Sequence, residues 1–134
     1  MATVALLGTL DTKGEEYAWL LDLLHGLGVA TLAIDTGSFS TSELADVSSD
    51  AVIAAAGVDV AAVRERRDRG EMMGVMGAGA AVVVRDLAES GRIHGLLAIG
   101  GSGGSSVAAP AMQALPVGFP KLLVSTMASG DVKP

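Results

Sequence analysis

The sequence predicts an α/β domain with an open, doubly wound, mainly parallel four-stranded sheet of the Rossmann-like kind. Half of the 134 residues are hydrophobic but only four are aromatic, so the core must consist mainly of aliphatic side chains. Such residues are typical of a parallel sheet covered by Ala-rich helices. Short apolar runs alternate with longer segments of helical periodicity, as in repeated strand–helix units. The length suits one domain, and we assign residues 1–134 to it.

The first strand–helix–strand unit is expected near the N-terminus. Residues 3–7 form a short apolar run and predict a buried strand. A helix is expected over residues 15–27, because several apolar positions follow the spacing of one helix face, namely Trp19, Leu20, Leu23, Leu24 and Leu27. Residues 29–34 predict the second strand, which closes with Asp35-Thr36-Gly37. The crossover between these two parallel strands should be right-handed.

The middle of the chain is expected to be a polar loop followed by helices. Residues 38–50 predict an extended loop, and short helices are expected over residues 49–56 and 60–69. The mixed charges from Arg64 to Arg69 are typical of a solvated helix face, with an interaction edge as the alternative. A further helix is predicted over residues 77–89, although residues 82–84 are also compatible with a strand. Gly74, Gly77 and Gly79 either allow close helix packing or open the helix beside a ligand.

The last part of the chain predicts two more strands. Residues 95–99 form the third strand, and a helix is expected over residues 105–115. Pro110 falls inside that helix, so the helix is expected either to begin near Ala109 or to be kinked. Residues 121–125 form the fourth strand, and a polar segment follows it. Because α/β domains seldom stop on the loop after a strand, we expect a truncated domain.

The segment from Gly100 to Ser106 is the strongest functional signal, because four of its seven residues are glycine and three are serine. It follows a strand and precedes a helix, where free backbone N–H groups and the helix dipole favour an anion. We therefore predict a glycine-rich loop that holds phosphate. The segment is neither a Walker A loop nor a complete G-x-G-x-x-G motif, and a tight turn without a ligand is the alternative.

The other strand ends supply further candidates, because the carboxyl ends of parallel strands lie at one edge of the sheet. Lys13 is predicted to contact a phosphate, or else to be a solvated loop residue. Asp35 is predicted to accept hydrogen bonds from a ribose, or else to stabilise a turn. Asp11 and Asp131 are candidates for holding Mg²⁺ through water. The complete predicted cofactor site contains Thr9, Asp11, Thr12, Lys13, Asp35, Gly101, Ser102, Gly103, Gly104, Ser105, Ser125 and Thr126.

Composition argues against several classes of partner and assigns no catalytic residue. The net charge is −6 and there is no basic stripe, which argues against DNA or RNA as a main partner. The chain has no cysteine, which excludes disulfides and fits a cytoplasmic protein. It also shows no signal peptide and no apolar run long enough to cross a membrane. His25 and His94 are expected away from the site, and no Ser–His–Asp arrangement follows from the spacing.

Four segments resemble the ATP-binding domain of the tobamovirus-resistance-protein-like family, a largely uncharacterised group of bacteria, fungi and plants. They are residues 8–16, 77–81, 100–104 and 125–131. Members of that family are longer and contain two α/β domains, so this chain would be part of the N-terminal one. The resemblance implies ATP binding and a homo-oligomer, specifically a dimer, and it implies no known reaction. Its plant representative inhibits viral RNA replication by binding the replication protein.

Three functions are therefore compatible with the sequence. The first is nucleotide binding, with ATP preferred. The second is a metabolic enzyme that acts on a phosphorylated or carboxylated small molecule in the same crevice. The third is a protein-interaction module that nucleotide stabilises.

Overall fold

The computed structural model describes residues 2–10, 12–37, 42–100 and 102–125. Within these ranges the elements alternate in the way the sequence predicts. Their bounds in chain order are β1 (Thr3–Gly8), α1 (Gly14–Gly26), β2 (Ala30–Asp35), α2 (Ser49–Ala55), α3 (Val60–Arg66), α4 (Arg69–Glu89), β3 (Gly95–Gly100), α5 (Ser102–Gln113) and β4 (Lys121–Ser125).

The four strands form one parallel sheet in the order β2-β1-β3-β4. In its register Leu7 of β1 lies between Ile34 of β2 and Ala98 of β3. The chain first moves from β1 to β2 and later continues on the other side of β1, so the direction of winding changes between β1 and β3. This arrangement confirms the predicted α/β, Rossmann-like fold class.

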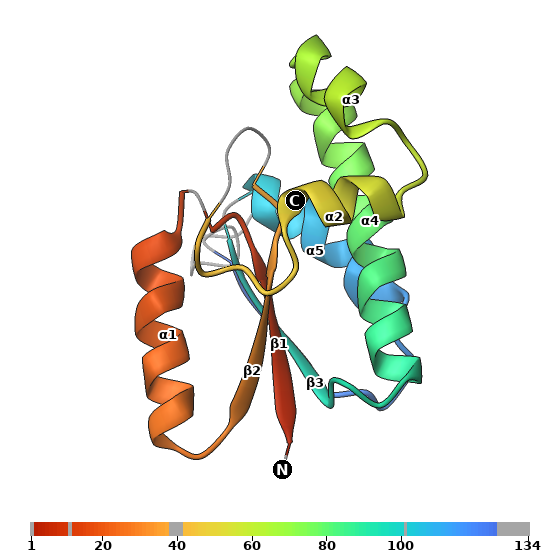
Figure 1. The fold of residues 1–134 in the computed structure, drawn as a ribbon. Coiled ribbons are helices and arrows are strands. Elements are labelled where there is room, and N and C mark those ends of the chain that lie inside the picture. The colour runs from red at the N-terminus through yellow and green to blue at the C-terminus, as the bar shows by residue number, and fades with distance from the viewer. Residues whose placement is uncertain (1, 11, 38–41, 101, 126–134) are drawn as a thin grey trace, which may run out of the picture.

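The helices cover the sheet unequally (Figure 1). On one face α1 packs over β1 and β2, with Leu6, Tyr17, Leu20 and Ala33 in its buried cluster. On the other face lie α2, α4 and α5, whose side chains form the larger core with the opposite side of the strands. The larger core is mainly aliphatic, as the composition predicts.

The buried face of α1 differs from the predicted one. Tyr17 and Leu20 are buried, whereas Trp19 and Leu27 are 65% and 70% exposed and Leu23 is also exposed. The prediction failed because this helix carries apolar residues around most of its circumference. Positions 17, 20, 21 and 24 satisfy the helical spacing as well as the predicted set does, and only packing on the sheet distinguishes the two.

Helix α4 begins at Arg69 rather than near residue 77, and residues 82–84 are helical rather than extended. The packing around its glycines explains why it tolerates them. A Cβ on Gly79 would collide with the carbonyl oxygen of Val52 in α2, and a Cβ on Gly77 would lie 3.3 Å from the Pro110 ring in α5. These two glycines therefore serve close helix packing, which decides between the two roles that the sequence allowed.

Helix α5 corrects the prediction of a glycine-rich loop over residues 100–106. The helix begins at Ser102, so Ser102 to Ser106 form its first turns instead of a loop. It also continues through Pro110, where Gly77 leaves room for the proline ring and Ala114 N–H donates to the Pro110 carbonyl at 3.1 Å. The run of glycines and serines favoured a loop, but the chain enters the helix within two residues of the end of β3.

The predicted helix over residues 60–69 is divided. Helix α3 ends at Arg66, Arg67 adopts a left-handed conformation with φ 51°, and Asp68 caps α4 by accepting from Glu71 N–H. Arg66 pairs with Glu71, and these charged side chains are at the surface. This run of charges is thus a solvated helix junction.

Candidate functional site

The carboxyl ends of all four strands lie at one edge of the sheet, because the strands are parallel. This edge brings together the ends of the four strands at Gly8, Asp35, Gly100 and Ser125. Helix α1 begins a few residues after β1, and helix α5 begins two residues after β3 ends. The N-termini of both helices therefore follow neighbouring strands, although α1 and α5 cover opposite faces.

The ladder between β1 and β3 ends early at this edge. Their paired register stops at Leu7 and Ala98, whereas β1 and β2 stay paired as far as Gly8 and Asp35. The two inner strands thus diverge where the winding direction changes. In open α/β sheets a ligand binds in the crevice at that position.

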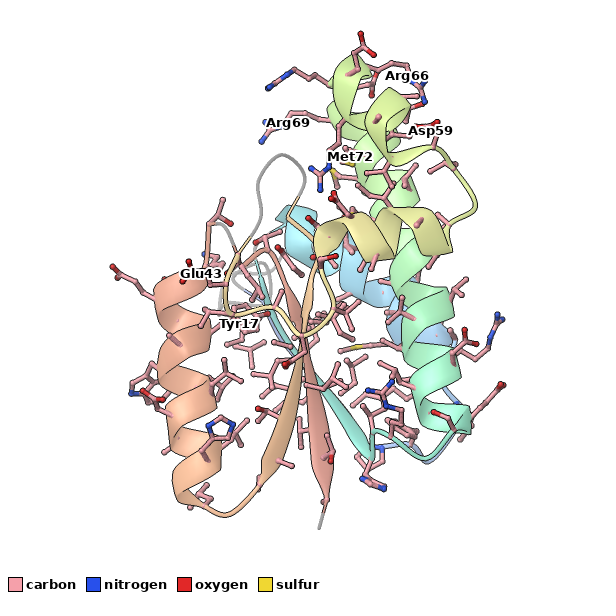
Figure 2. All side chains as sticks on the ribbon, viewed as in Figure 1. Tyr17, Glu43, Asp59, Arg66, Arg69 and Met72 are labelled. Atoms are coloured by element: carbon pink, nitrogen blue, oxygen red, sulfur yellow. The ribbon has the colours of Figure 1, made fainter. Side chains whose placement is uncertain are left out.

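Tyr17 of α1 stabilises the divergence of these strands, and the sequence analysis did not identify it. Its hydroxyl accepts from Ile99 N–H at 2.8 Å and reaches the Leu7 carbonyl at 2.5 Å and the Ile99 carbonyl at 3.0 Å. One hydroxyl therefore bridges β1 and β3 in place of a direct bond between the strands. Figure 2 shows Tyr17 between α1 and the strands.

Gly8 makes this position of Tyr17 possible. A Cβ on Gly8 would collide with the Tyr17 hydroxyl and ring, so only glycine fits at the end of β1. Burial raises the pKa of the Tyr17 phenol from 10.0 to about 12, and the Ile99 backbone hydrogen bond acts in the opposite direction. The phenol is therefore neutral at physiological pH and serves as a hydrogen-bond bridge. In the sequence, the only indication of this bridge is a tyrosine in the helix that follows a strand ending in glycine.

The turn between β1 and α1 carries four predicted site residues, of which the structure describes three. Thr9 closes it, because its carbonyl accepts from Lys13 N–H at 2.8 Å and from Thr12 N–H at 3.1 Å. The Thr9 and Thr12 hydroxyls are 2.8 Å apart. Lys13 is the N-cap residue of α1, and its side chain does not cap the helix. These residues share the carboxyl edge, as predicted, and Asp11 between them lies outside the described residues.

Asp35 is fully buried and has a role in the fold. Its Oδ1 accepts from Gly37 N–H at 2.8 Å and from Leu10 N–H at 3.3 Å, which joins the turn after β2 to the turn after β1. Of the two predicted roles, these bonds establish the turn-stabilising one. The carboxylate thereby shapes the edge on which the other candidates lie.

The remaining predicted residues are only partly described. The structure places Ser102, Gly103, Gly104 and Ser105 in the first turn of α5 and Ser125 at the end of β4. Gly101, Thr126 and Asp131 lie outside the described residues. His94 lies at the opposite edge, where its Nδ1 accepts from Thr3 N–H at 3.0 Å, and His25 pairs with Thr31.

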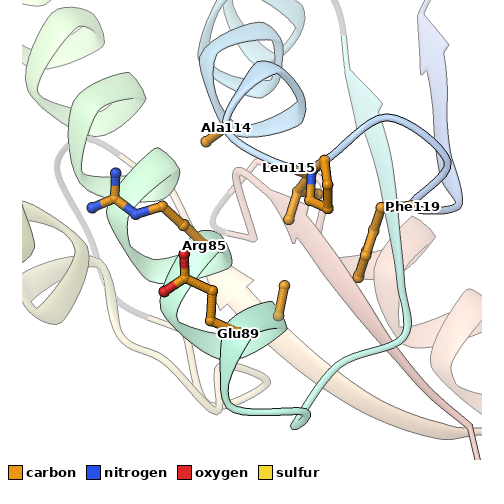
Figure 3. A pocket seen from close by; sticks show the side chains of 7 residues that line it. Arg85, Glu89, Ala114, Leu115 and Phe119 are labelled. Atoms are coloured by element: carbon orange, nitrogen blue, oxygen red, sulfur yellow. The ribbon is translucent and has the colours of Figure 1, made fainter.

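A cavity of about 320 Å³ lies elsewhere, between the C-terminal ends of α4 and α5 and the loop before β4 (Figure 3). Arg85 and Glu89 line one side of it, and Leu115 and Phe119 line another. This cavity is at the amino edge of β3 and β4, so it does not coincide with the candidate site.

Among the described residues no group of three or more His, Cys, Asp or Glu side chains is placed to hold a metal ion. Within the same residues, no helix has the length and apolar character needed to cross a membrane.

The fold, with its four parallel strands and the change of winding direction between β1 and β3, defines a Rossmann-like α/β domain. Residues 2–134 match the model of the uncharacterised protein family (UPF0261) N-terminal domain, and the chain belongs to this family. It is similar to the UPF0261 protein of Clostridium tetani, with 41% identity over 98% of this chain and 33% of the relative. A Rhizobium meliloti UPF0261 protein is 37% identical over all of this chain and 33% of the relative.

A plant protein is also similar. The ToMV susceptible protein tm-1(GCR26) of Solanum lycopersicum is 27% identical over 97% of this chain and 19% of its own length. This match confirms the resemblance to the tobamovirus-resistance-protein-like family. The chain spans about a third of the length of the bacterial relatives that it matches.

Proposed function

We propose that this domain binds a nucleotide, with ATP preferred, at the carboxyl edge between β1 and β3. The observation that carries the proposal is the early end of the β1–β3 ladder at the point where the winding changes. Both strands there lead into helix N-termini, and a helix N-terminus presents free N–H groups and positive dipole to an anion.

Each predicted residue of the described edge has a role in this proposal. The first turn of α5, from Ser102 to Ser105, donates backbone N–H groups to phosphate oxygens. Lys13 supplies a positive charge from the turn before α1. Thr9, Thr12 and Ser125 contribute hydroxyls from the neighbouring strand ends, and Mg²⁺ accompanies the phosphates.

Asp35 remains the proposed acceptor of hydrogen bonds from a ribose, and it also stabilises the edge. Because its carboxylate accepts from the backbone of both neighbouring turns, it holds Leu10 and Gly37 in place. In this proposal the turn that carries Lys13 has a fixed position before the ligand binds.

The other proposed properties follow the family. We place the domain at the N-terminus of a longer two-domain protein in the cytoplasm, and we propose that the whole protein is a dimer. The bacterial relatives are about three times as long as this chain, which supports the first of these. A metabolic enzyme and a nucleotide-stabilised interaction module use the same crevice and remain the alternatives to test.

Thermal unfolding in the presence of ATP with Mg²⁺ tests the proposal. Ligand at 100 times its Kd adds about 2.7 kcal/mol to the free energy of unfolding, which raises Tm by roughly 10 °C for a domain of this size. Lys13→Ala is expected to weaken ATP binding about tenfold, because it removes one charged phosphate contact. Arg92→Ala, an exposed cation at the opposite edge, is the matched control and should leave ATP binding unchanged.

The outcome separates the functions. A shift with ATP but with neither NAD nor sugar phosphates supports nucleotide binding, and ATP turnover that Lys13→Ala abolishes indicates the enzyme. If a folded chain shows no shift with any phosphate ligand, or if both variants bind equally, the phosphate site is wrong.

A further inference from the structure

One face of the sheet carries a set of exposed and half-buried apolar side chains that the described helices cover only in part. We call it the open apolar face and define it by five residues from α1, β3 and β4. They are Leu23, Leu97, Ile99, Leu122 and Val124.

The strand register places the β4 residues on the same face as α1. Leu97 and Ile99 of β3 pack against the cluster under α1, and their partners in the parallel register are Leu122 and Val124. Paired residues of adjacent strands point to the same side of a sheet. The intervening residue, Leu123, points the other way and packs against the larger core.

These β4 side chains are unusually exposed for a parallel sheet. Leu122 is 59% exposed and Val124 is 51% exposed. Parallel sheets normally have both faces covered by helices. Here α2, α4 and α5 all lie on the opposite face, and α1 packs mainly over β1 and β2 and leaves the β4 side of this face exposed (Figure 1).

The flank of α1 continues the same surface. His25 bonds to Thr31 of β2, so that side of the helix faces β2. Leu23 lies about 160° around the helix from His25, at roughly 100° per residue, and is therefore on the flank of α1 away from β2. A helix that packs on β3 and β4 would contact the sheet with one side and the flank of α1 with another.

We infer that the open apolar face is the docking site for an amphipathic helix of the polypeptide that follows this domain in the longer protein. The bacterial relatives are about three times as long as this chain, and the matched model describes an N-terminal domain. Polypeptide that continues after β4 would start beside the uncovered side of the sheet. We therefore take it as the occupant of this face. The five residues carry no charge, so the docking side of that helix is apolar.

The absence of cysteine from the chain permits a direct test. Leu122→Cys and Val124→Cys are made separately in this chain and in a chimera that continues into the remainder of the Clostridium tetani relative. Because a thiol under a packed helix reacts only when that helix opens, we expect labelling at least about tenfold slower in the chimera. Asp86→Cys, exposed on α4 across the sheet, is the control and should react equally in both.

Two results would overturn the inference. One is equally fast labelling of the Leu122→Cys and Val124→Cys variants in both chains while the Asp86→Cys control behaves as expected. The other is protection in the short chain that grows with protein concentration, which means that a second copy covers the face. If the chimera does not fold, oxidative footprinting of the intact relative and of its matched third gives the same comparison. Equal reactivity of the aligned β4 side chains in the two proteins would contradict the inference.

Discussion

At the scale of single residues, the central feature is the hydroxyl of Tyr17. It replaces one direct bond of the β1–β3 ladder with two bonds through an oxygen, from Ile99 N–H and to the Leu7 carbonyl. A direct bond would bring the two strands closer together at the carboxyl edge, where their pairing ends at Leu7 and Ala98. The side chain therefore sets the separation of the strands next to the proposed phosphate site.

Tyr17→Phe is expected to lower the free energy of unfolding by about 1–3 kcal/mol. The substitution keeps the ring but leaves the Ile99 N–H and the Leu7 carbonyl without their shared partner in a buried position. Chemical denaturation of the variant measures the loss. Trp19→Phe, on the exposed side of the same helix, is the control and should change stability by less than about 0.5 kcal/mol. Equal stability of the two variants would show that the bridge contributes nothing.

Residues of this kind are hard to predict from the sequence. The positions of Thr9, Lys13 and Asp35 at the carboxyl edge follow from strand order, because each comes directly after an apolar run. Tyr17 comes from a helix and reaches residue 99, which is distant in the sequence. The structural role of Asp35 was likewise one of two possibilities until its bonds to Leu10 and Gly37 were located.

At the scale of the elements, close packing explains the glycines of α4. Gly77 faces the Pro110 ring of α5, and Gly79 faces the backbone of α2. The three helices on this side of the sheet can approach one another only because these positions lack a side chain. The same contacts hold α5 in its position behind β3, at the start of the proposed site.

A pair of glycine substitutions tests this packing. Gly79→Ala is expected to destabilise the domain by about 1–3 kcal/mol, because its Cβ collides with the Val52 carbonyl oxygen. Gly74→Ala, in the same helix with nothing within 4 Å of its Cβ, should instead stabilise by about 0.5–1 kcal/mol. Unfolding curves of both variants measure whether each alanine lowers or raises the free energy of unfolding. The packing role is wrong if both alanines stabilise.

The strands were easier to predict than the helices. Each strand is a short apolar run, and all four were located to within about one residue. The start of α4 was missed because glycines at 70, 74, 77 and 79 lower helix propensity, and tertiary packing overrides that tendency. The glycines before Ser105 had the same effect on the predicted start of α5.

At the scale of the whole molecule, the buried phenol links stability to alkaline pH. The pKa of Tyr17 is about 12 in the folded protein, against an ordinary value of 10.0. Between these values the unfolded chain ionises and the folded chain does not, so unfolding becomes more favourable as the pH rises.

The stability that Tyr17 contributes is fully present below pH 10 and declines as the pH rises towards 12. The decline from this group is expected to be about 2–3 kcal/mol, at roughly 1.36 kcal/mol per pH unit. Denaturation curves of the wild type and Tyr17→Phe at several pH values separate the contribution of Tyr17 from that of lysine titration. The wild type should lose stability more steeply over this range, and parallel profiles would argue against a perturbed phenol.

The whole domain also has two unequal sides. The face under α2, α4 and α5 is covered, whereas half of the α1 face exposes Leu122 and Val124. Composition and strand order predicted the sheet, but they did not indicate which face would be left open. That distinction depends on where each crossover passes, which the structure alone provides.

The bridge at Tyr17 also has a consequence for the order of events during synthesis. A nascent chain that has emerged only through β2 contains the tyrosine and the Leu7 carbonyl, but it lacks Ile99, which supplies the remaining contacts of the hydroxyl. The Tyr17 hydroxyl therefore gains its contacts with β3 only after residue 99 has been translated.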